Sequence, residues 1–202
     1  GEKAAKLTVV PLKGWKRSMT FDKTGMPWVL PSPHIPQPAT AFYYPATGIL
    51  GELYYVSIGV GYTLPFQLIC ADWIDADKFA ARMNALNLPG TKFRPIHVKP
   101  FYGTGKGENL QGVQFYVDDV PGSSLTLIQF YAMQELAKLY PEKRIFDTAT
   151  DKSRFDMFDK VCGTDKIRTL FSKNYQVSDM IDYWNKDAEA FKEKAKKYYL
   201  YK

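Results

Sequence analysis

The pattern of apolar and polar side chains predicts strands as the main elements of the first two thirds of the chain, and one segment alternates cleanly. Between 112 and 118, Val113, Phe115 and Val117 fall on one face of an extended segment, while polar or small residues occupy the other. The segment 92–98 is interrupted by Pro95, which places that strand at the edge of a sheet. Strands are expected over residues 7–11, 66–71, 92–98 and 112–118.

Apolar residues spaced three and four positions apart predict helices over 76–86, 125–140, 153–161, 165–172 and from 179 to about 199. Asp75, the turn Pro121–Ser124 and Ser178 are expected to cap three of them. The segment 41–50, which contains Pro45, is compatible with a short helix or a turn. The last helix carries one continuous core-facing stripe of apolar residues: Ile181, Trp184, Ala188, Phe191, Ala195 and Tyr198.

The long segment 13–38 fits neither pattern. Five prolines between 27 and 38 exclude a regular helix or a central strand. Trp15, Phe21 and Trp28 argue against disorder, so we expect an ordered loop that borders a cleft. Together the elements predict an α+β fold in a single domain, 1–202. It has a mixed or antiparallel sheet with helices packed on it, a long ordered N-terminal loop and a C-terminal amphipathic helix.

Composition narrows the function only slightly. Of the 202 residues 46% are hydrophobic and 15% aromatic, which is typical of a globular protein with a well-filled core or a sugar-facing surface. The net charge of +6 owes much to the lysine-rich end 186–202, so no nucleic-acid partner is indicated. Cys70 and Cys162 are expected as free thiols. No metal site, cofactor or membrane span is predicted, and the N-terminus lacks a signal-peptide core.

The stretch 52–67 is the best candidate for a ligand surface. Gly59 and Gly61 permit backbone conformations that other residues avoid, and tyrosines and hydroxyl residues surround them. A tight turn that leads into a strand explains the glycines equally well. The spacing is too short for a dinucleotide-binding fingerprint.

Other motifs are better explained structurally. The segment 103–108 has glycines around Lys106, but it lacks the serine or threonine of a phosphate-binding loop and leads into a strand. His97 is expected to be structural, whereas His34 on its proline-bounded loop is a candidate hydrogen-bond donor to a ligand. Paired carboxylates at 72, 75 and 77 would suit glycosidase chemistry, yet capping and the helix dipole account for the last two.

Several short motifs, in order along the whole chain, resemble the NamZ (YbbC-like) family of bacterial exo-β-N-acetylmuramidases. They include Gly14-Trp-Lys-Arg17, Gly25-Met-Pro-Trp28, Pro31-Ser-Pro-His-Ile-Pro36, Tyr44-Pro-Ala-Thr47, Trp73-Ile-Asp-Ala76, Leu86-Asn-Leu-Pro-Gly90 and Gly163-Thr-Asp165. The resemblance implies an enzyme that removes terminal N-acetylmuramic acid from peptidoglycan fragments. It also implies a longer protein, whose N-terminal Rossmann-like domain is thought to hold the catalytic groups and is absent from this chain.

The chain departs from the family in its central stretch. The family pattern reads E-G-T-N-x-S-E-G-R-G-T-T-x-P-F-E, and this chain has Ile58, Val60 and Gln67 where the family has Glu, Arg and Glu. His34 replaces an asparagine of the family. Either the ligand differs, or these positions pack against the partner domain.

The resemblance therefore implies an auxiliary domain that forms one wall of a sugar-binding cleft in the bacterial cell envelope, periplasm or secreted fraction. Its partners would be the N-terminal catalytic domain and a peptidoglycan-derived sugar, and the isolated chain would be inactive, with no catalytic residue of its own identified. The residues expected to contact sugar are His34, Tyr44, Glu52, Tyr54, Ser57, Tyr62 and Thr63. The alternatives are a non-catalytic glycan-binding module and a purely structural partner of the missing domain.

Overall fold

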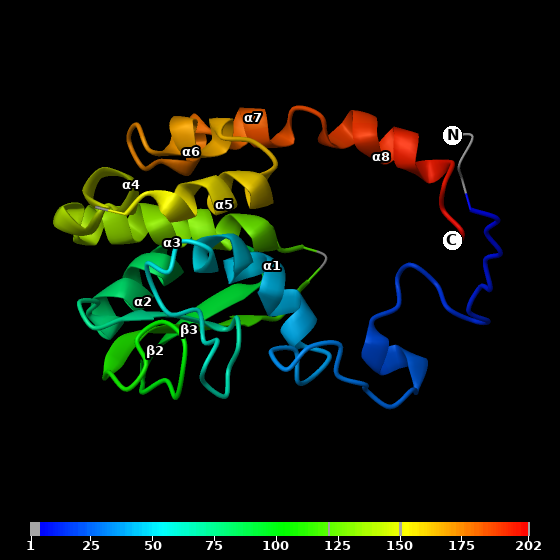
Figure 1. The fold of residues 1–202 in the computed structure, drawn as a ribbon, viewed down its shortest axis with the longest axis horizontal. Coiled ribbons are helices and arrows are strands. Elements are labelled where there is room, and N and C mark those ends of the chain that lie inside the picture. The colour runs from blue at the N-terminus through cyan, green and yellow to red at the C-terminus, as the bar shows by residue number, and fades with distance from the viewer. Residues whose placement is uncertain (1–4, 121, 150, 202) are drawn as a thin grey trace. The chain divides into compact units, whose positions relative to one another are not determined.

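The computed structural model describes residues 5–120, 122–149 and 151–201, which fall into two units. The larger unit runs from Val29 to Trp184, and the smaller joins the segment that ends at Trp28 to the segment that starts at Asn185. The larger unit contains an antiparallel sheet in the order β1 (Leu68–Ala71), β3 (Leu110–Val117), β2 (Thr91–Val98), with helices packed on it (Figure 1). The expected α+β class is confirmed.

The three strands lie close to where the hydrophobic pattern predicts them. Pro95 pairs with Val113 from the edge strand β2, where its missing N–H costs no bond inside the sheet. Alternation gives the sheet two buried faces. One, with Val113 and Phe115, belongs to the main core beneath the helices, and the other carries a smaller cluster: Leu68, Cys70, Val98 and Leu110.

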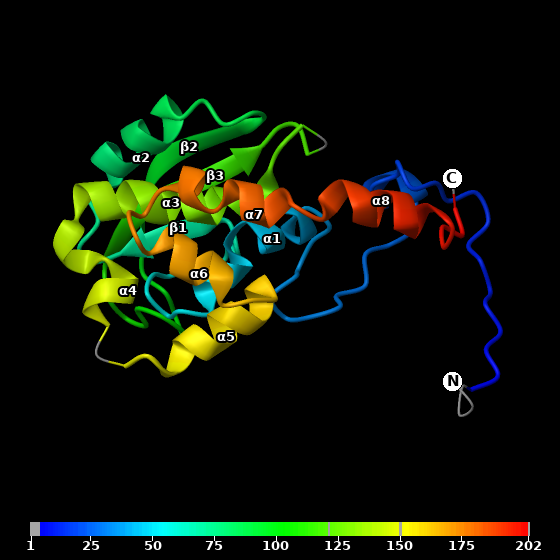
Figure 2. The same cartoon turned by 90° about the horizontal axis from the view of Figure 1, so that it is seen from above.

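Helices cover the face of the sheet that carries Val113 and Phe115 (Figure 1). Predicted helices are found as α2 (Ala76–Ala85), α3 (Leu125–Leu139), α5 (Ser153–Cys162) and α6 (Lys166–Phe171), with the short α4 (Ile145–Thr148) between them. In Figure 1, α3 lies between the sheet and the layer of α5, α6 and α7 (Ile181–Asn185), and Figure 2 shows α6 and α7 crossing in front of it. The 3₁₀ turn Pro141–Lys143 lies between α3 and α4, and the 3₁₀ turn Val177–Asp179 lies between α6 and α7.

Aromatic rings hold the helical layers together. Phe130 on α3 is fully buried, and its ring packs edge-on against Phe158, Phe171 and Trp184 at centroid distances of 6.2, 5.7 and 5.3 Å. Those three partners come from α5, α6 and α7, so one side chain joins every helix of the outer layer to α3.

The segment around Pro45 is a helix, α1 (Thr40–Gly51), rather than a turn. A proline inside a helix removes one backbone donor, so α1 needs support from outside. Gln129 of α3, which is fully buried, ties two other backbone groups of α1 to α3: its Nε2 donates to the Pro45 carbonyl at 2.9 Å, and its Oε1 accepts from the Leu50 N–H at 3.0 Å. Thr47 adds a bond from its hydroxyl to the Phe66 carbonyl at 2.9 Å.

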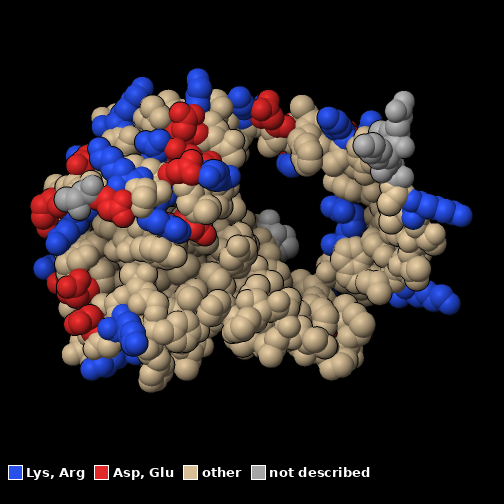
Figure 3. Space-filling model, in the orientation of Figure 1, with Lys and Arg blue, Asp and Glu red and all other residues tan. Residues whose placement is uncertain are grey.

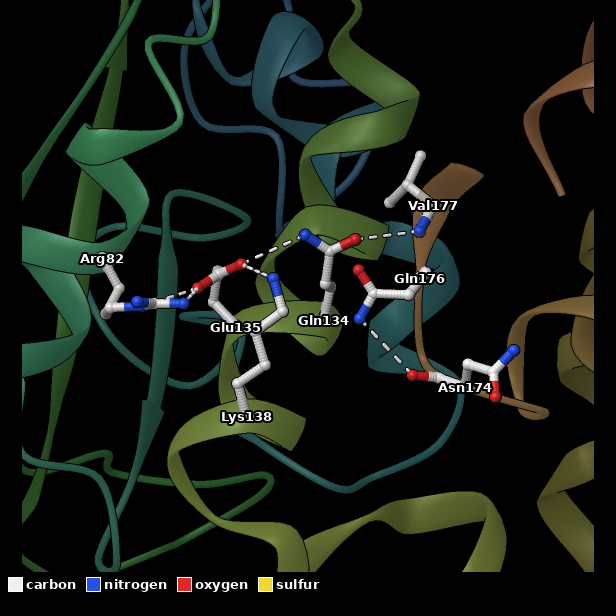
Figure 4. Close-up of polar contacts among 7 residues, drawn as sticks. All are labelled: Arg82, Gln134, Glu135, Lys138, Asn174, Gln176 and Val177. Carbon is white, nitrogen blue, oxygen red and sulfur yellow. Dashed lines mark hydrogen bonds and ion pairs between the residues drawn. The ribbon is translucent and has the colours of Figure 1, made fainter. Parts of the chain in front are cut away.

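Glu135 of α3 is a buried charge that is fully paired (Figure 4). Its carboxylate accepts from Arg82 on α2 at 2.6 Å and from Lys138 at 2.7 Å, and Gln134 adds a bond at 3.1 Å while accepting from the Val177 N–H. Burial by itself would raise the pKa of Glu135. The hydrogen bonds from Lys138, Gln134 and Arg82 outweigh it, and the pKa lies below its usual range.

Of the caps predicted for α2 and α3, one is confirmed and one is not. Asp75 caps α2 as expected, accepting from the Lys78 N–H at 3.0 Å. Ser124 stands at the start of α3, but its side chain makes no capping bond there. Pro121, expected in the preceding turn, lies outside the described residues. Both cysteines are free thiols, as predicted.

The predicted first strand is wrong. Residues 7–11 form no strand, and the side chains of Leu7 and Val10 are 82% and 87% exposed. A β-branched run forms a strand only when another strand supplies hydrogen-bond partners, and none pairs with it in the described chain.

The predicted continuous last helix is also wrong. It breaks at Lys186 and Asp187 into α7 and α8 (Ala188–Lys196), and Phe191 and Tyr198 are 66% and 71% exposed. Ser178 lies in a 3₁₀ turn and makes no cap. The stripe therefore faces the core only in its first part.

The smaller unit is built from both ends of the chain. The Leu12 N–H donates to the Tyr201 hydroxyl at 2.7 Å, and the Arg17 guanidinium lies 3.7 Å from the centre of the Tyr199 ring. Trp15 packs edge-on against Tyr201 at 4.8 Å. The segment also forms a 3₁₀ turn at Phe21–Thr24. These contacts show order in the first part of the proline-rich segment.

Replacing Gln129 with leucine should lower the free energy of unfolding by about 2 kcal/mol, because two buried backbone groups of α1 each lose a hydrogen bond. Urea denaturation measures the change. Gln176→Leu is the matched control, since Gln176 makes only a 3.5 Å contact with the Asn174 carbonyl, and it should change stability little. Equal losses for the two variants would contradict the role assigned to Gln129.

Glu135→Gln should destabilise the protein most near neutral pH. The folded-state pKa of Glu135 is lowered, so its contribution is present above the unfolded-state pKa and is lost as pH falls through the folded-state value. The difference in unfolding free energy between wild type and variant should therefore shrink between about pH 5 and pH 3. Denaturation curves across this range test it, and a difference independent of pH would contradict it.

Candidate functional site

A cavity of about 790 Å³ opens in the larger unit at the C-terminal half of α1, and we name it the site cavity. Its walls are formed by α1, the loop that follows α1, the proline-rich segment and the loop between β2 and β3. Its lining residues are His34, Tyr44, Gly48, Gly51, Glu52, Tyr54, Val56, Ile58, Val60, Phe66, Tyr102, Gly103 and Thr104. The volume falls within the range of small-molecule sites.

Three tyrosine rings give the site cavity flat, partly exposed faces. Tyr44, Tyr54 and Tyr102 are 52%, 64% and 49% exposed. Tyr44 is held edge-on against Phe66 at 4.8 Å, and the Tyr102 hydroxyl lies 3.2 Å from His34 Nδ1. Rings with an apolar face and a polar tip suit the faces and hydroxyls of a sugar.

One carboxylate, Glu52, lines the site cavity among the described residues, and it is paired. Arg154 of α5 donates from Nη2 to Glu52 Oε2 at 2.7 Å and from Nε to the Glu52 carbonyl at 2.7 Å. The same guanidinium lies 4.2 Å from the centre of the Tyr54 ring. Sequence reasoning missed Arg154, because a lone arginine early in a helix about 100 positions away gives no local signal.

Gly59 and Gly61 do not line the site cavity themselves, but they flank Val60, which does. Gly61 has a φ of +97°, and its carbonyl accepts from the Phe101 N–H at 2.8 Å. A Cβ added at Gly61 would overlap the carbonyl oxygen of Tyr102. Gly59 is equally constrained by the Leu64 carbonyl. These two glycines therefore serve close backbone packing, which places Val60 and Tyr102 in one wall.

The structure brings together four of the seven residues predicted to contact sugar: His34, Tyr44, Glu52 and Tyr54. Ser57 is buried, and its backbone forms an isolated bridge with Cys70 beside β1. Tyr62 lines a second cavity, and Thr63 is exposed outside both. Sequence reasoning also missed Tyr102, Gly103 and Thr104 in the lining, because the segment 103–108 lacks a phosphate-binding motif and gave no other signal of a site.

Ile58 and Val60, which stand at charged positions of the family pattern, belong to the apolar part of the wall. Ile58 is only 8% exposed and packs so closely on Gly51 that a Cβ there would overlap it. Val60 is half-buried against the main core. Because Ile58 is buried within its own unit, it does not form an exposed apolar patch that would require a partner domain.

Two aspartates lie outside the site cavity. Asp72 and Asp75 line a smaller cavity of about 280 Å³. Hydrogen bonds from the Lys78 backbone and side chain lower the pKa of Asp75, which makes it a poor general acid. In the described part of the chain no cluster of histidine, cysteine or carboxylate side chains could hold a metal ion. The helices described there are all too short or too polar to cross a membrane.

Comparison with family models decides the classification. The model described as exo-β-N-acetylmuramidase NamZ, C-terminal, matches residues 42–201, and the one described as exo-β-N-acetylmuramidase NamZ, N-terminal, matches residues 1–39. This chain belongs to the NamZ family. The resemblance identified from short sequence motifs is thereby confirmed, and the proline-rich segment 13–38 lies within the match to the N-terminal model.

Individual relatives agree with the NamZ assignment. The peptidoglycan β-N-acetylmuramidase NamZ of Bacillus subtilis is 37% identical over 197 residues, which are 98% of this chain and 46% of the relative. The crystal structure of a DUF1343 family protein from Bacteroides fragilis is 54% identical, with a TM-score of 0.91 over 94% of this chain and 49% of that one. The chain thus spans about half the length of the relatives it matches.

Gly61→Ala should destabilise the protein much more than Gly107→Ala. Both glycines have positive φ, but a Cβ at Gly107 meets nothing within 4 Å, whereas one at Gly61 overlaps the Tyr102 backbone. We expect a loss of about 1 kcal/mol at Gly107 from the left-handed backbone alone and of more than about 3 kcal/mol at Gly61. Thermal and urea denaturation compare them, and equal losses would refute the packed wall.

Proposed function

We propose that this chain provides the substrate-binding cleft wall of a peptidoglycan-processing NamZ-type glycoside hydrolase, while the catalytic groups lie for the most part outside it. The observation that carries the proposal is the site cavity itself, with three tyrosine faces, a histidine and a single, ion-paired carboxylate. Glycoside hydrolysis commonly needs two carboxylates flanking the scissile bond. The site cavity has the surface to hold a sugar and lacks that pair among the described residues.

The proposed ligand is a peptidoglycan-derived sugar with a terminal N-acetylmuramic acid. The relative from Bacillus subtilis is named a peptidoglycan β-N-acetylmuramidase, which supports the substrate class. In the site cavity, Tyr44 and Tyr54 would stack on the sugar, and His34 and Tyr102 would donate hydrogen bonds. The N-terminal domain of the family would be the partner across the cleft, and the bacterial cell envelope, periplasm or secreted fraction the location.

A non-catalytic glycan-binding module is the second candidate. It is favoured by one observation: the described lining offers aromatic faces and hydrogen-bonding groups, while its one carboxylate, Glu52, is held in an ion pair with Arg154. Both candidates require binding by the isolated chain. They differ once the chain is joined to a NamZ N-terminal domain, because only the first then gives turnover.

The isolated chain should bind N-acetylmuramic acid but should not hydrolyse a chromogenic glycoside of that sugar. Calorimetry measures the binding, and Tyr44→Ala should weaken it about fivefold through lost stacking. Tyr116→Ala is the matched control, because Tyr116 is a partly exposed tyrosine on β3 outside the site cavity.

Two results would overturn the proposal. Turnover by the isolated chain that disappears in Glu52→Gln would place catalysis within this chain. A flat titration of the wild type with the sugar would remove the cleft-wall role and leave only the structural alternative.

A further inference from the structure

A second cavity, of about 770 Å³, adjoins the site cavity and has no role in the function proposed above. Two backbone segments separate them. Val60 and Tyr102 line the site cavity, whereas Tyr62 and Phe101 line the second, and the Phe101 N–H bonds to the Gly61 carbonyl across the wall. A glycan that extends beyond the site cavity would therefore pass over this wall to reach the second cavity.

Charge distinguishes the second cavity. The lysines Lys99 and Lys106 line it, and no aspartate or glutamate appears among its described lining residues. Neither Lys99 nor Lys106 forms an ion pair in the described chain. Glu108 is nearby in sequence but does not line the cavity. On the face shown in Figure 3, by contrast, positive and negative side chains are interspersed over the helical layer.

The apolar lining of the second cavity offers a platform beside these cations. The rings of Tyr62 and Phe101 are nearly parallel, 13° apart, with centroids separated by 6.5 Å, and Phe101 is 73% exposed. Behind them, the buried side chains of Val98 and Leu110 come from the small cluster on the far face of the sheet. Flat rings beside ammonium groups suit a sugar that carries a carboxylate.

We infer that the second cavity binds a further carboxylate-bearing sugar of the same glycan whose terminal sugar occupies the site cavity. Lys99 and Lys106 would pair with its carboxylate, and Phe101 would stack on its ring. The inference rests on the function proposed for the site cavity. It adds a preference for acidic chains longer than a disaccharide.

Calorimetry with the full chain tests this inference. The ligands are a peptide-free peptidoglycan disaccharide, with one N-acetylmuramic acid, and the corresponding tetrasaccharide, with two. Wild type should bind the tetrasaccharide more tightly, and high salt should reduce the difference. The double variant Lys99→Ala, Lys106→Ala should lose about tenfold in affinity for the tetrasaccharide and less than about twofold for the disaccharide.

The control is the double variant Lys166→Ala, Lys173→Ala, which removes the same charge from exposed positions outside both cavities and should change neither affinity. Phe101→Ala should also weaken tetrasaccharide binding selectively. Unchanged tetrasaccharide affinity in the Lys99, Lys106 variant, or an equal loss for both ligands, would overturn the inference alone. If wild type binds neither glycan, the result contradicts the function proposed for the site cavity, on which this inference rests.

Discussion

The placement of α1 depends on one buried amide. Pro45 deprives this helix of a backbone donor in its interior, and glycines at 48 and 51 weaken it further. The side chain of Gln129 anchors the weakened helix to the neighbouring α3, since it donates to one α1 backbone group and accepts from another. Because α1 carries Tyr44 and leads directly into Glu52, the amide of Gln129 also fixes one side of the site cavity.

The glycines of α1 have a further consequence. Gly48 and Gly51 both line the site cavity, and Gly51 makes room for Ile58, whose side chain would otherwise collide with α1. A helix of high intrinsic propensity would have had side chains at these positions and a narrower cavity. The sequence thus trades helix stability for space, and Gln129 and the Thr47 hydroxyl offset part of that cost.

Electrostatics in the site cavity differ from the family pattern. Two charged positions of the pattern are apolar here, so the wall at Ile58 and Val60 is part of the packed core. The guanidinium that lies closest to the lining tyrosines comes instead from Arg154, where it is shared between Glu52 and the Tyr54 ring. The ion pair with Arg154 holds the Glu52 carboxylate in place at this end of the site cavity. A carboxylate held in this way is a poor candidate for proton transfer to a leaving group.

The hydrophobic pattern of the sequence, by periodicity or by a short apolar run, predicted β1–β3, α2, α3, α5 and α6. It failed where structure depends on distant groups. The helix at Pro45 is anchored by an amide more than 80 residues away. Residues 7–11 have strand composition, but no strand in the described part of the chain pairs with them.

The last helix breaks at a run of polar residues, which an apolar stripe alone does not reveal. For the site cavity, aromatic and glycine-rich composition indicated the stretch 52–67, part of which lines the cavity. The contribution of Tyr102–Thr104 and of Arg154 arises from tertiary packing, because only the folded chain brings them beside α1.

The central claim is that this chain holds the sugar in the site cavity while the reacting carboxylates lie elsewhere. Amide chemical shifts recorded while N-acetylmuramic acid is added to the isotope-labelled chain test it most directly. We expect saturable shifts at Gly48, Gly51, Tyr54 and Thr104, with little change around Asp72 and Asp75. Shifts confined to Asp72 and Asp75, or absent throughout, would contradict it.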